Sequence, residues 1–115
     1  MLRGIANSER VKFTLKEDKE NPTIFWIKNI SQDKKLELWG DMKDQDGKVD
    51  NMKALAKSEA IFCAGIAKIE NLGEGKEEIE LIDKNVFNRF TYLEQQEVIG
   101  AISNFNFQGK LEIKN

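Results

Sequence analysis

Alternating apolar and polar positions over residues 10–29 predict a β-hairpin near the start of the chain. Apolar side chains run from Val11 to Leu15 at every second position, with lysine and threonine between them, as in a strand with one face in water. A charged turn follows and ends at Pro22, the only proline. The next run, 23–28, is apolar on both faces, so we expect it to be covered on both sides.

Two helices are predicted next. Ser31 can accept a hydrogen bond from the amides that open a short helix, which should end near Gly40. A longer helix fits residues 50–70, whose apolar positions form one broad stripe, and the alternative is a switch to strand near Phe62. Gly65 costs this helix about 1 kcal/mol relative to alanine, and such a glycine usually allows a neighbour to pack closely.

Asn71-Leu72-Gly73 should end this helix, because glycine tolerates the left-handed conformation that closes a last turn. Residues 76–82 alternate and predict a short, half-exposed strand. Asp83 can cap a brief helical segment, and Thr91 with Glu94 forms a capping-box pattern.

The capping-box helix should run to about residue 104. Val98, Ile102 and Phe105 share one apolar stripe of this helix. The last ten residues either add a strand or dock on a neighbour. Together the elements predict a single α+β domain over 1–115, with a small, mostly antiparallel sheet that includes the N-terminal hairpin and packs against two main helices.

Length and charge limit the possible partners. The 115 residues suffice for about one domain, and the formal net charge is −2. Lysines alternate with carboxylates through the first half, so no basic face is evident and we expect no direct nucleic-acid partner. One cysteine, no signal-peptide pattern and no apolar run of roughly 20 residues predict a cytoplasmic protein without a membrane partner.

The residue types offer little chemistry. Histidine is absent, which excludes serine–histidine and cysteine–histidine mechanisms. Cys63 lies in an apolar run and is expected to be a buried hydrophobe. Asp44 to Gly47 fails as a calcium loop because Lys53 stands where the bidentate glutamate belongs, and Gly73 to Lys76 lacks the first Walker glycine. We therefore predict no catalytic residue, no cofactor, no metal site and a non-enzymatic function.

Aromatic side chains are the best candidates for protein binding, because they bring a large contact area at low entropic cost. Core packing is the alternative for each of them, and it is favoured for Trp26 within the apolar strand. For Phe105 and Phe107, near the chain end, core packing and partner binding are more evenly balanced. The predicted interface consists of Trp39, Phe105, Phe107, Leu111 and Ile113.

Several short motifs give the chain a family resemblance. Phe13-Thr14-Leu15-Lys16, Asn21-Pro22-Thr23-Ile24-Phe25, Ile30-Ser31 and Ile69-Glu70-Asn71-Leu72-Gly73 follow one another in an order that resembles small structural-region proteins of tailed phages and prophages, particularly the tail assembly chaperone-like group. The resemblance implies binding without catalysis. The chain would shield apolar helices of a tape-measure or other tail protein before assembly, or would self-associate as a homo-oligomer within the virion. It also implies a location in the host cytoplasm or in the virion.

The alternative hypothesis is a small phage or mobile-element accessory protein that inhibits a host protein. Its binding surface would be the acidic segment 74–83. Binding through such a surface should depend steeply on salt, whereas an apolar contact should resist salt.

Overall fold

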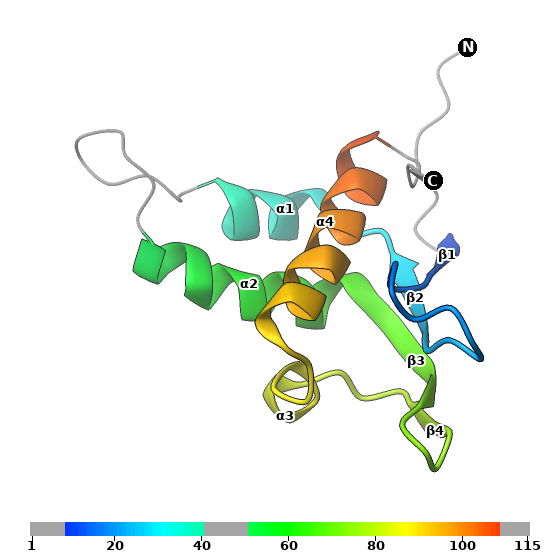
Figure 1. Ribbon diagram of the computed structural model, residues 1–115. Helices are drawn as coiled ribbons and strands as arrows, with labels where there is room; N and C mark the ends of the chain where they lie inside the picture. The colour runs from blue at the N-terminus through cyan, green and yellow to red at the C-terminus, as the bar shows by residue number, and fades with distance from the viewer. Residues whose placement is uncertain (1–8, 41–50, 109–115) are drawn as a thin grey trace.

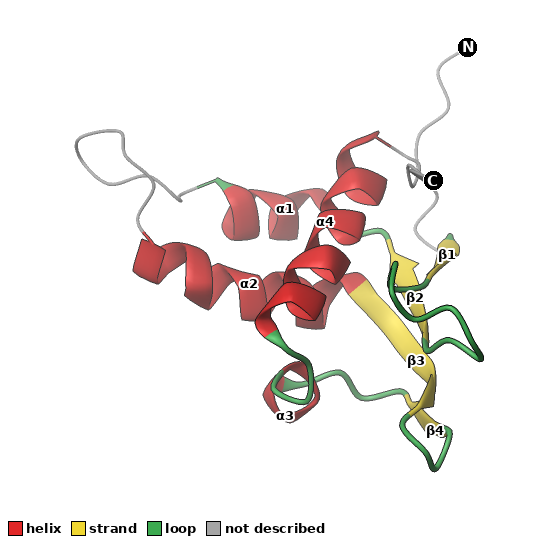
Figure 2. Ribbon diagram, viewed as in Figure 1, coloured by secondary structure: helices red, strands yellow, loops and turns green. Residues whose placement is uncertain are grey.

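The computed structural model describes residues 9–40 and 51–108, which form an antiparallel four-stranded sheet with helices packed on it (Figure 1). The strand order is β1-β2-β3-β4. Figure 2 shows the helices gathered on one side of the molecule and the strands on the other, so the predicted α+β class is confirmed. The elements are β1 Arg10–Phe13, β2 Ile24–Lys28, α1 Gln32–Trp39, α2 Asn51–Gly65, β3 Ile66–Leu72, β4 Glu77–Ile79, α3 Lys84–Phe87 and α4 Tyr92–Gln108.

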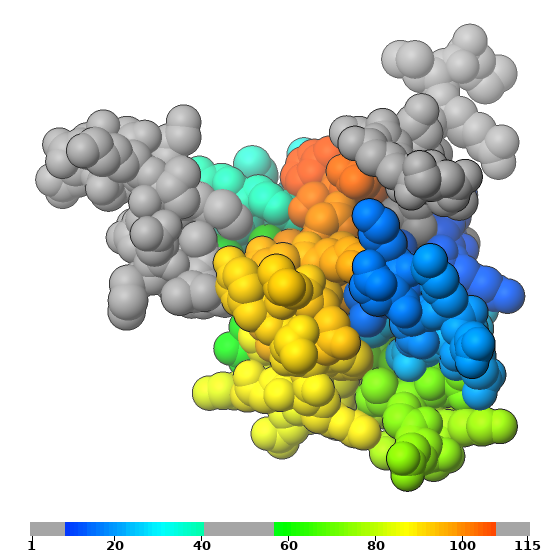
Figure 3. Space-filling model, viewed as in Figure 1, coloured from blue at the N-terminus to red at the C-terminus, as the bar shows by residue number. Residues whose placement is uncertain are grey.

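The predicted N-terminal hairpin is present as β1 and β2. Val11 pairs with Ile27 and Phe13 with Phe25, so the apolar side chains of both strands lie on the same face of the sheet. Phe25 and Ile27 are fully buried beneath the helices. In Figure 3 the turn after β1 lies beside α4, and there the Lys16 N–H donates to Glu97 Oε2 at 2.6 Å.

The predicted helix over 50–70 is wrong in its second part. The helix α2 ends at Gly65, and β3 begins at the next residue. Ile66 and Ile69 are three residues apart, a spacing that also fits a helical stripe, but pairing with β2 places Ile69 opposite Phe25 in the sheet. The predicted alternative, a switch near Phe62, is close to the observed boundary.

The segment Asn71-Leu72-Gly73 therefore does not end a helix. Asn71 and Leu72 complete β3, and Gly73 begins the tight turn into β4. Asn71 and Gly73 have φ values of 60° and 71°, in the left-handed region. Glycine and asparagine are the residues that tolerate this region best, which explains why the same sequence pattern suits both a helix stop and this turn.

Three predicted helix starts are confirmed by hydrogen bonds. The side chains of Ser31 and Asp83 each accept from the backbone N–H three residues later, at 3.4 and 3.1 Å. At the start of α4, the Thr91 N–H donates to Glu94 Oε1 at 2.8 Å, and the Glu94 N–H donates to Thr91 Oγ1 at 3.3 Å. This reciprocal pair is the predicted capping box.

Gly65 lies where α2 meets α4. A Cβ atom at this position would lie 2.4 Å from Ile102 Cγ2, which is much closer than van der Waals contact. The prediction that this glycine allows a neighbour to pack closely is therefore confirmed. The core around it includes buried residues from α1, α2, α4 and the sheet, namely Phe25, Ile27, Leu38, Ile61, Phe62, Ile66, Ile69, Val98, Ile102 and Phe105.

Candidate protein-binding surfaces

Phe105 is a core residue and is not available to a partner, so its prediction as an interface residue is wrong. Its side chain is 0% exposed and belongs to the same buried stripe of α4 as Val98 and Ile102. The position near the chain end suggested exposure, but α4 continues to Gln108 and carries Phe105 into the buried core cluster. Leu111 and Ile113, from the same prediction, lie outside the described residues.

Trp39 and Phe107, the other two predicted residues, contact each other across α1 and α4. Their ring centroids are 4.9 Å apart at an interplanar angle of 85°, an edge-to-face arrangement. Phe107 is nevertheless 58% exposed, and Leu36, on the same helix as Trp39, is 65% exposed. Lys35 Nζ lies 5.6 Å from the Phe107 ring centroid. We refer to Lys35, Leu36, Trp39 and Phe107 as the α1–α4 patch.

Sequence reasoning did not include Leu36 and Lys35 in this surface. The available signal was their spacing, because residues three and four positions before Trp39 lie on the same side of a helix. The contact with α4 depends on tertiary packing and has no signal in the local sequence.

Asn106 holds the base of the α1–α4 patch in place. It is 3% exposed, and its Oδ1 accepts from the Ile30 N–H at 2.6 Å. Its Nδ2 donates to the carbonyls of Lys28 and Ile102, at 3.2 and 2.9 Å. The Lys35 ammonium group donates to the Asn106 carbonyl at 2.9 Å. These hydrogen bonds connect the end of α4 to β2 and α1, so they fix the relative positions of the two helices that carry the patch.

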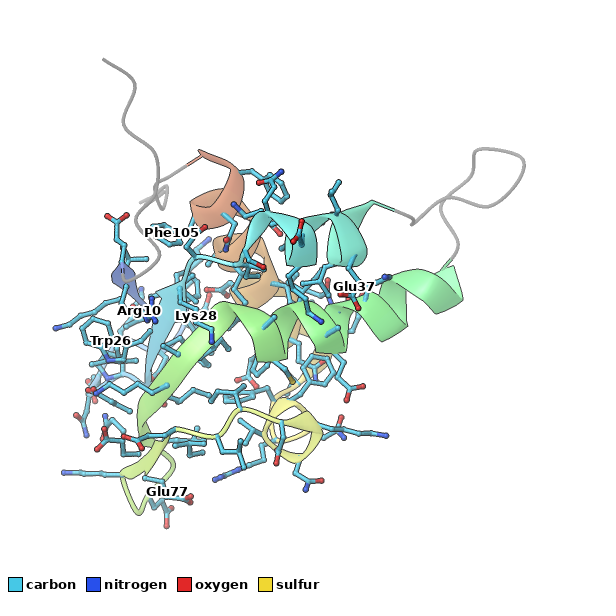
Figure 4. All side chains as sticks on the ribbon, turned by 180° about the vertical axis from the view of Figure 1, so that it is seen from behind. Arg10, Trp26, Lys28, Glu37, Glu77 and Phe105 are labelled. Carbon is cyan, nitrogen blue, oxygen red and sulfur yellow. The ribbon has the colours of Figure 1, made fainter. Side chains whose placement is uncertain are left out.

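A second surface is the face of the sheet away from the helices. Trp26 lies at its centre, half-buried, with Lys12 Nζ 5.3 Å and Lys68 Nζ 5.9 Å from its ring centroid. The indole N–H donates to Glu70 Oε1 at 2.9 Å. Figure 4 shows Arg10, Trp26 and Lys28 close together on this side.

This outer face corrects the expectation that the run 23–28 is covered on both sides. In the parts of the chain that the structure describes, helices cover only the inner side. An open hollow of about 410 Å³ lies on the outer side, lined by Arg10, Trp26, Ala67, Lys68 and Glu80.

The acidic segment is partly neutralised by basic side chains. Glu77 accepts two hydrogen bonds from the Arg89 guanidinium, at 3.1 and 3.2 Å, and these bonds lower the pKa of Glu77. Lys68 forms ion pairs with Glu70 at 2.9 Å and with Glu78 at 3.3 Å. The Lys68 and Trp26 hydrogen bonds lower the pKa of Glu70. An inhibitor that bound a host protein through the acidic segment would therefore present fewer unpaired carboxylates than the sequence suggests.

Two of the motifs that carry the family resemblance, Asn21 to Phe25 and Ile69 to Gly73, meet in space. Asn71 Nδ2 donates to the carbonyls of Asn21 and Pro22, at 2.7 and 3.1 Å. Thr23 Oγ1 donates to the Asn71 carbonyl at 3.0 Å. These bonds join the turn before β2 to the end of β3, so the motifs stabilise the sheet.

Cys63, the single cysteine of the chain, is partly buried in the fold. Burial raises the pKa of the Cys63 thiol, and the nearby Glu59 and Asp83 act in the same direction, so the thiolate is disfavoured. Among the side chains that the structure describes, those of residues 9–40 and 57–107, no three cysteine or acidic side chains are grouped to hold a metal ion. Within the same ranges, no helix has the length and apolar character needed to cross a membrane.

Comparisons with family models, with curated proteins and with solved structures found no match for this chain.

Proposed function

We propose that this protein is a non-enzymatic assembly protein of a phage or prophage, similar to tail assembly chaperones, that binds an apolar helix of another protein. The α1–α4 patch would be its binding surface. The observation that carries the proposal is the exposure of Phe107 on a folded domain whose other aromatic contacts lie largely in the core. The assignment to a phage or prophage rests on the sequence resemblance. That resemblance implies that the bound partner is a tape-measure or other tail protein.

The composition of the patch suits an amphipathic helix. Trp39 and Phe107 provide a rigid aromatic centre, and Leu36 extends the apolar surface along α1. Lys35 adds a cation at one edge, as is common at the polar rim of an interface. A client helix with apolar residues at spacings of three and four could place them on these rings.

A direct test uses a synthetic helical peptide with a leucine stripe and alternating lysine and glutamate elsewhere. Calorimetry should show binding to the wild-type protein but not to a scrambled peptide of the same composition. Phe107→Ser should weaken binding about tenfold, because the loss of an anchoring aromatic side chain typically costs more than about 1 kcal/mol. The matched control is Leu93→Ser, an exposed apolar residue at the other end of α4.

Two further results complete the test. Binding should persist at high salt, and the indole N–H resonance of Trp39 should shift on titration with the peptide. Equal affinities for wild type and Phe107→Ser, or equal weakening by Leu93→Ser, would contradict the proposed surface. Phe105→Ser is unsuitable for this purpose, because the loss of a fully buried phenylalanine would destabilise the fold itself.

The acidic-inhibitor hypothesis has less support. Three carboxylates in or beside the segment 74–83 are paired with Lys68 or Arg89. Asp83 is engaged as a helix cap. Steep salt dependence of partner binding would favour this alternative over the apolar patch.

A further inference from the structure

The outer face of the sheet has an uneven distribution of charge. Its side chains alternate with the buried ones, as the burial of β2 shows, with Trp26 outward and Phe25 and Ile27 inward. Three cations, Arg10, Lys12 and Lys28, lie on β1 and β2.

The other half of the face is acidic. Glu70 on β3 and Glu78 on β4 both contact Lys68, and Glu80 lines the hollow beside Trp26. Three carboxylates thus accompany a single lysine on this half. Within the described parts of the chain, none of the ion pairs involves Lys12, Lys28 or Glu80. Lys12 lies over the Trp26 ring and keeps its charge on this face.

We infer that this face binds a second copy of the same chain in a two-fold symmetric dimer. A two-fold axis that lies between the sheets and runs along the strands would reverse the strand order of the second copy. The basic β1–β2 half of each copy would then face the acidic β3–β4 half of the other. A surface with one positive and one negative half is complementary to itself under this operation, as an isologous interface requires.

The centre of the face supports the same arrangement. Trp26 lies on β2, an inner strand of the sheet, so the two copies would bring their tryptophans near the axis. Aromatic side chains at the centre of an interface with charged residues around them match the usual anatomy of protein contacts. The open hollow next to Trp26 gives the side chains of the second copy room to enter. This inference does not depend on the proposed client of the α1–α4 patch.

Charge reversal tests the dimer sharply. One variant, K12E/K28E, makes both halves acidic, and the other, E78K/E80K, makes both halves basic. Sedimentation velocity over a wide concentration range, at about 0.05 M and about 0.5 M salt, should show a wild-type dimer that weakens as salt rises. Each variant alone should dissociate at least about tenfold more readily, because like charges then face each other. An equimolar mixture should form a heterodimer.

The control K34E/K84E makes the same change in net charge as K12E/K28E, but on α1 and α3, away from the sheet, and should dimerise like wild type. Circular dichroism would verify that each variant is folded, and the single variants K12E and E80K would replace any pair that is not. A wild-type monomer at every concentration would overturn the inference. So would unchanged dimerisation of either reversed variant, or a mixture that remains monomeric.

Discussion

Replacing Gly65 with alanine tests a close contact between the two long helices. The new methyl group would lie 2.4 Å from Ile102 Cγ2 and 2.9 Å from the Cγ1 and Cδ1 atoms. Ile102 is fully buried, and its β-branched side chain has few alternative rotamers on a helix. The helices must therefore move apart. Overpacking of this kind costs about 1 to 3 kcal/mol, more than alanine gains over glycine in helix propensity.

Gly100→Ala provides a matched control. This glycine lies within α4, and apart from its chain neighbours and the nearby backbone of the helix, no atom lies within 4 Å of the position that its Cβ would occupy. The same substitution should therefore stabilise the protein by about 1 kcal/mol through helix propensity. Urea unfolding followed by circular dichroism should give free-energy changes of opposite sign for the two variants. In thermal unfolding, each 1 kcal/mol corresponds to a shift of about 4 to 8 °C for a domain near this size.

A neutral or stabilising Gly65→Ala would refute the reasoning, provided that Gly100→Ala shows its gain. A double-mutant cycle gives a second measure. Ile102→Ala removes the clashing atoms, so its cost and that of Gly65→Ala should not add. Additive costs would mean that the two residues do not interact.

Two further predictions concern polar groups. Asn106→Leu removes the acceptor for the buried Ile30 N–H and should lower the free energy of unfolding in urea by about 1 to 3 kcal/mol, whereas an unchanged value would mean that this N–H finds another partner. An NMR titration should show Glu77 with a pKa below its ordinary value, restored in Arg89→Ala, and an unchanged pKa would contradict the pairing. Because the folded-state pKa is depressed, the pair stabilises the fold above the ordinary pKa of glutamate, and this contribution disappears as pH falls through the lowered value.

Local signals in the sequence predicted the hairpin and the helix starts correctly. Ser31, Asp83 and Thr91 act on amides within the next three residues, so their effect can be read from neighbouring positions. The boundary between α2 and β3 could not be read in this way. Ile66 and Ile69 suit a helical stripe and a buried strand equally, and only pairing with the distant β2 distinguishes the two.

The candidate surfaces were only partly predictable for the same reason. Trp39 and Phe107 were identified as aromatic anchors, but their mutual contact arises from the packing of α1 against the end of α4. The apolar stripe that contains Phe105 already indicated burial, and this signal was more reliable than nearness to the chain end. The charge division on the outer face depends on strand order, which no local pattern specifies.

The position of α1 and α2 between β2 and β3 has a consequence for folding kinetics. The β1–β2 and β3–β4 hairpins join neighbouring segments, and each can form with little loss of chain entropy. The central pairing, in which Phe25 meets Ile69, must instead close a loop that contains both helices. Such distant pairings slow folding, so we expect the central pairing to be the late step. The two halves of the outer face would become one continuous surface only when that step is complete.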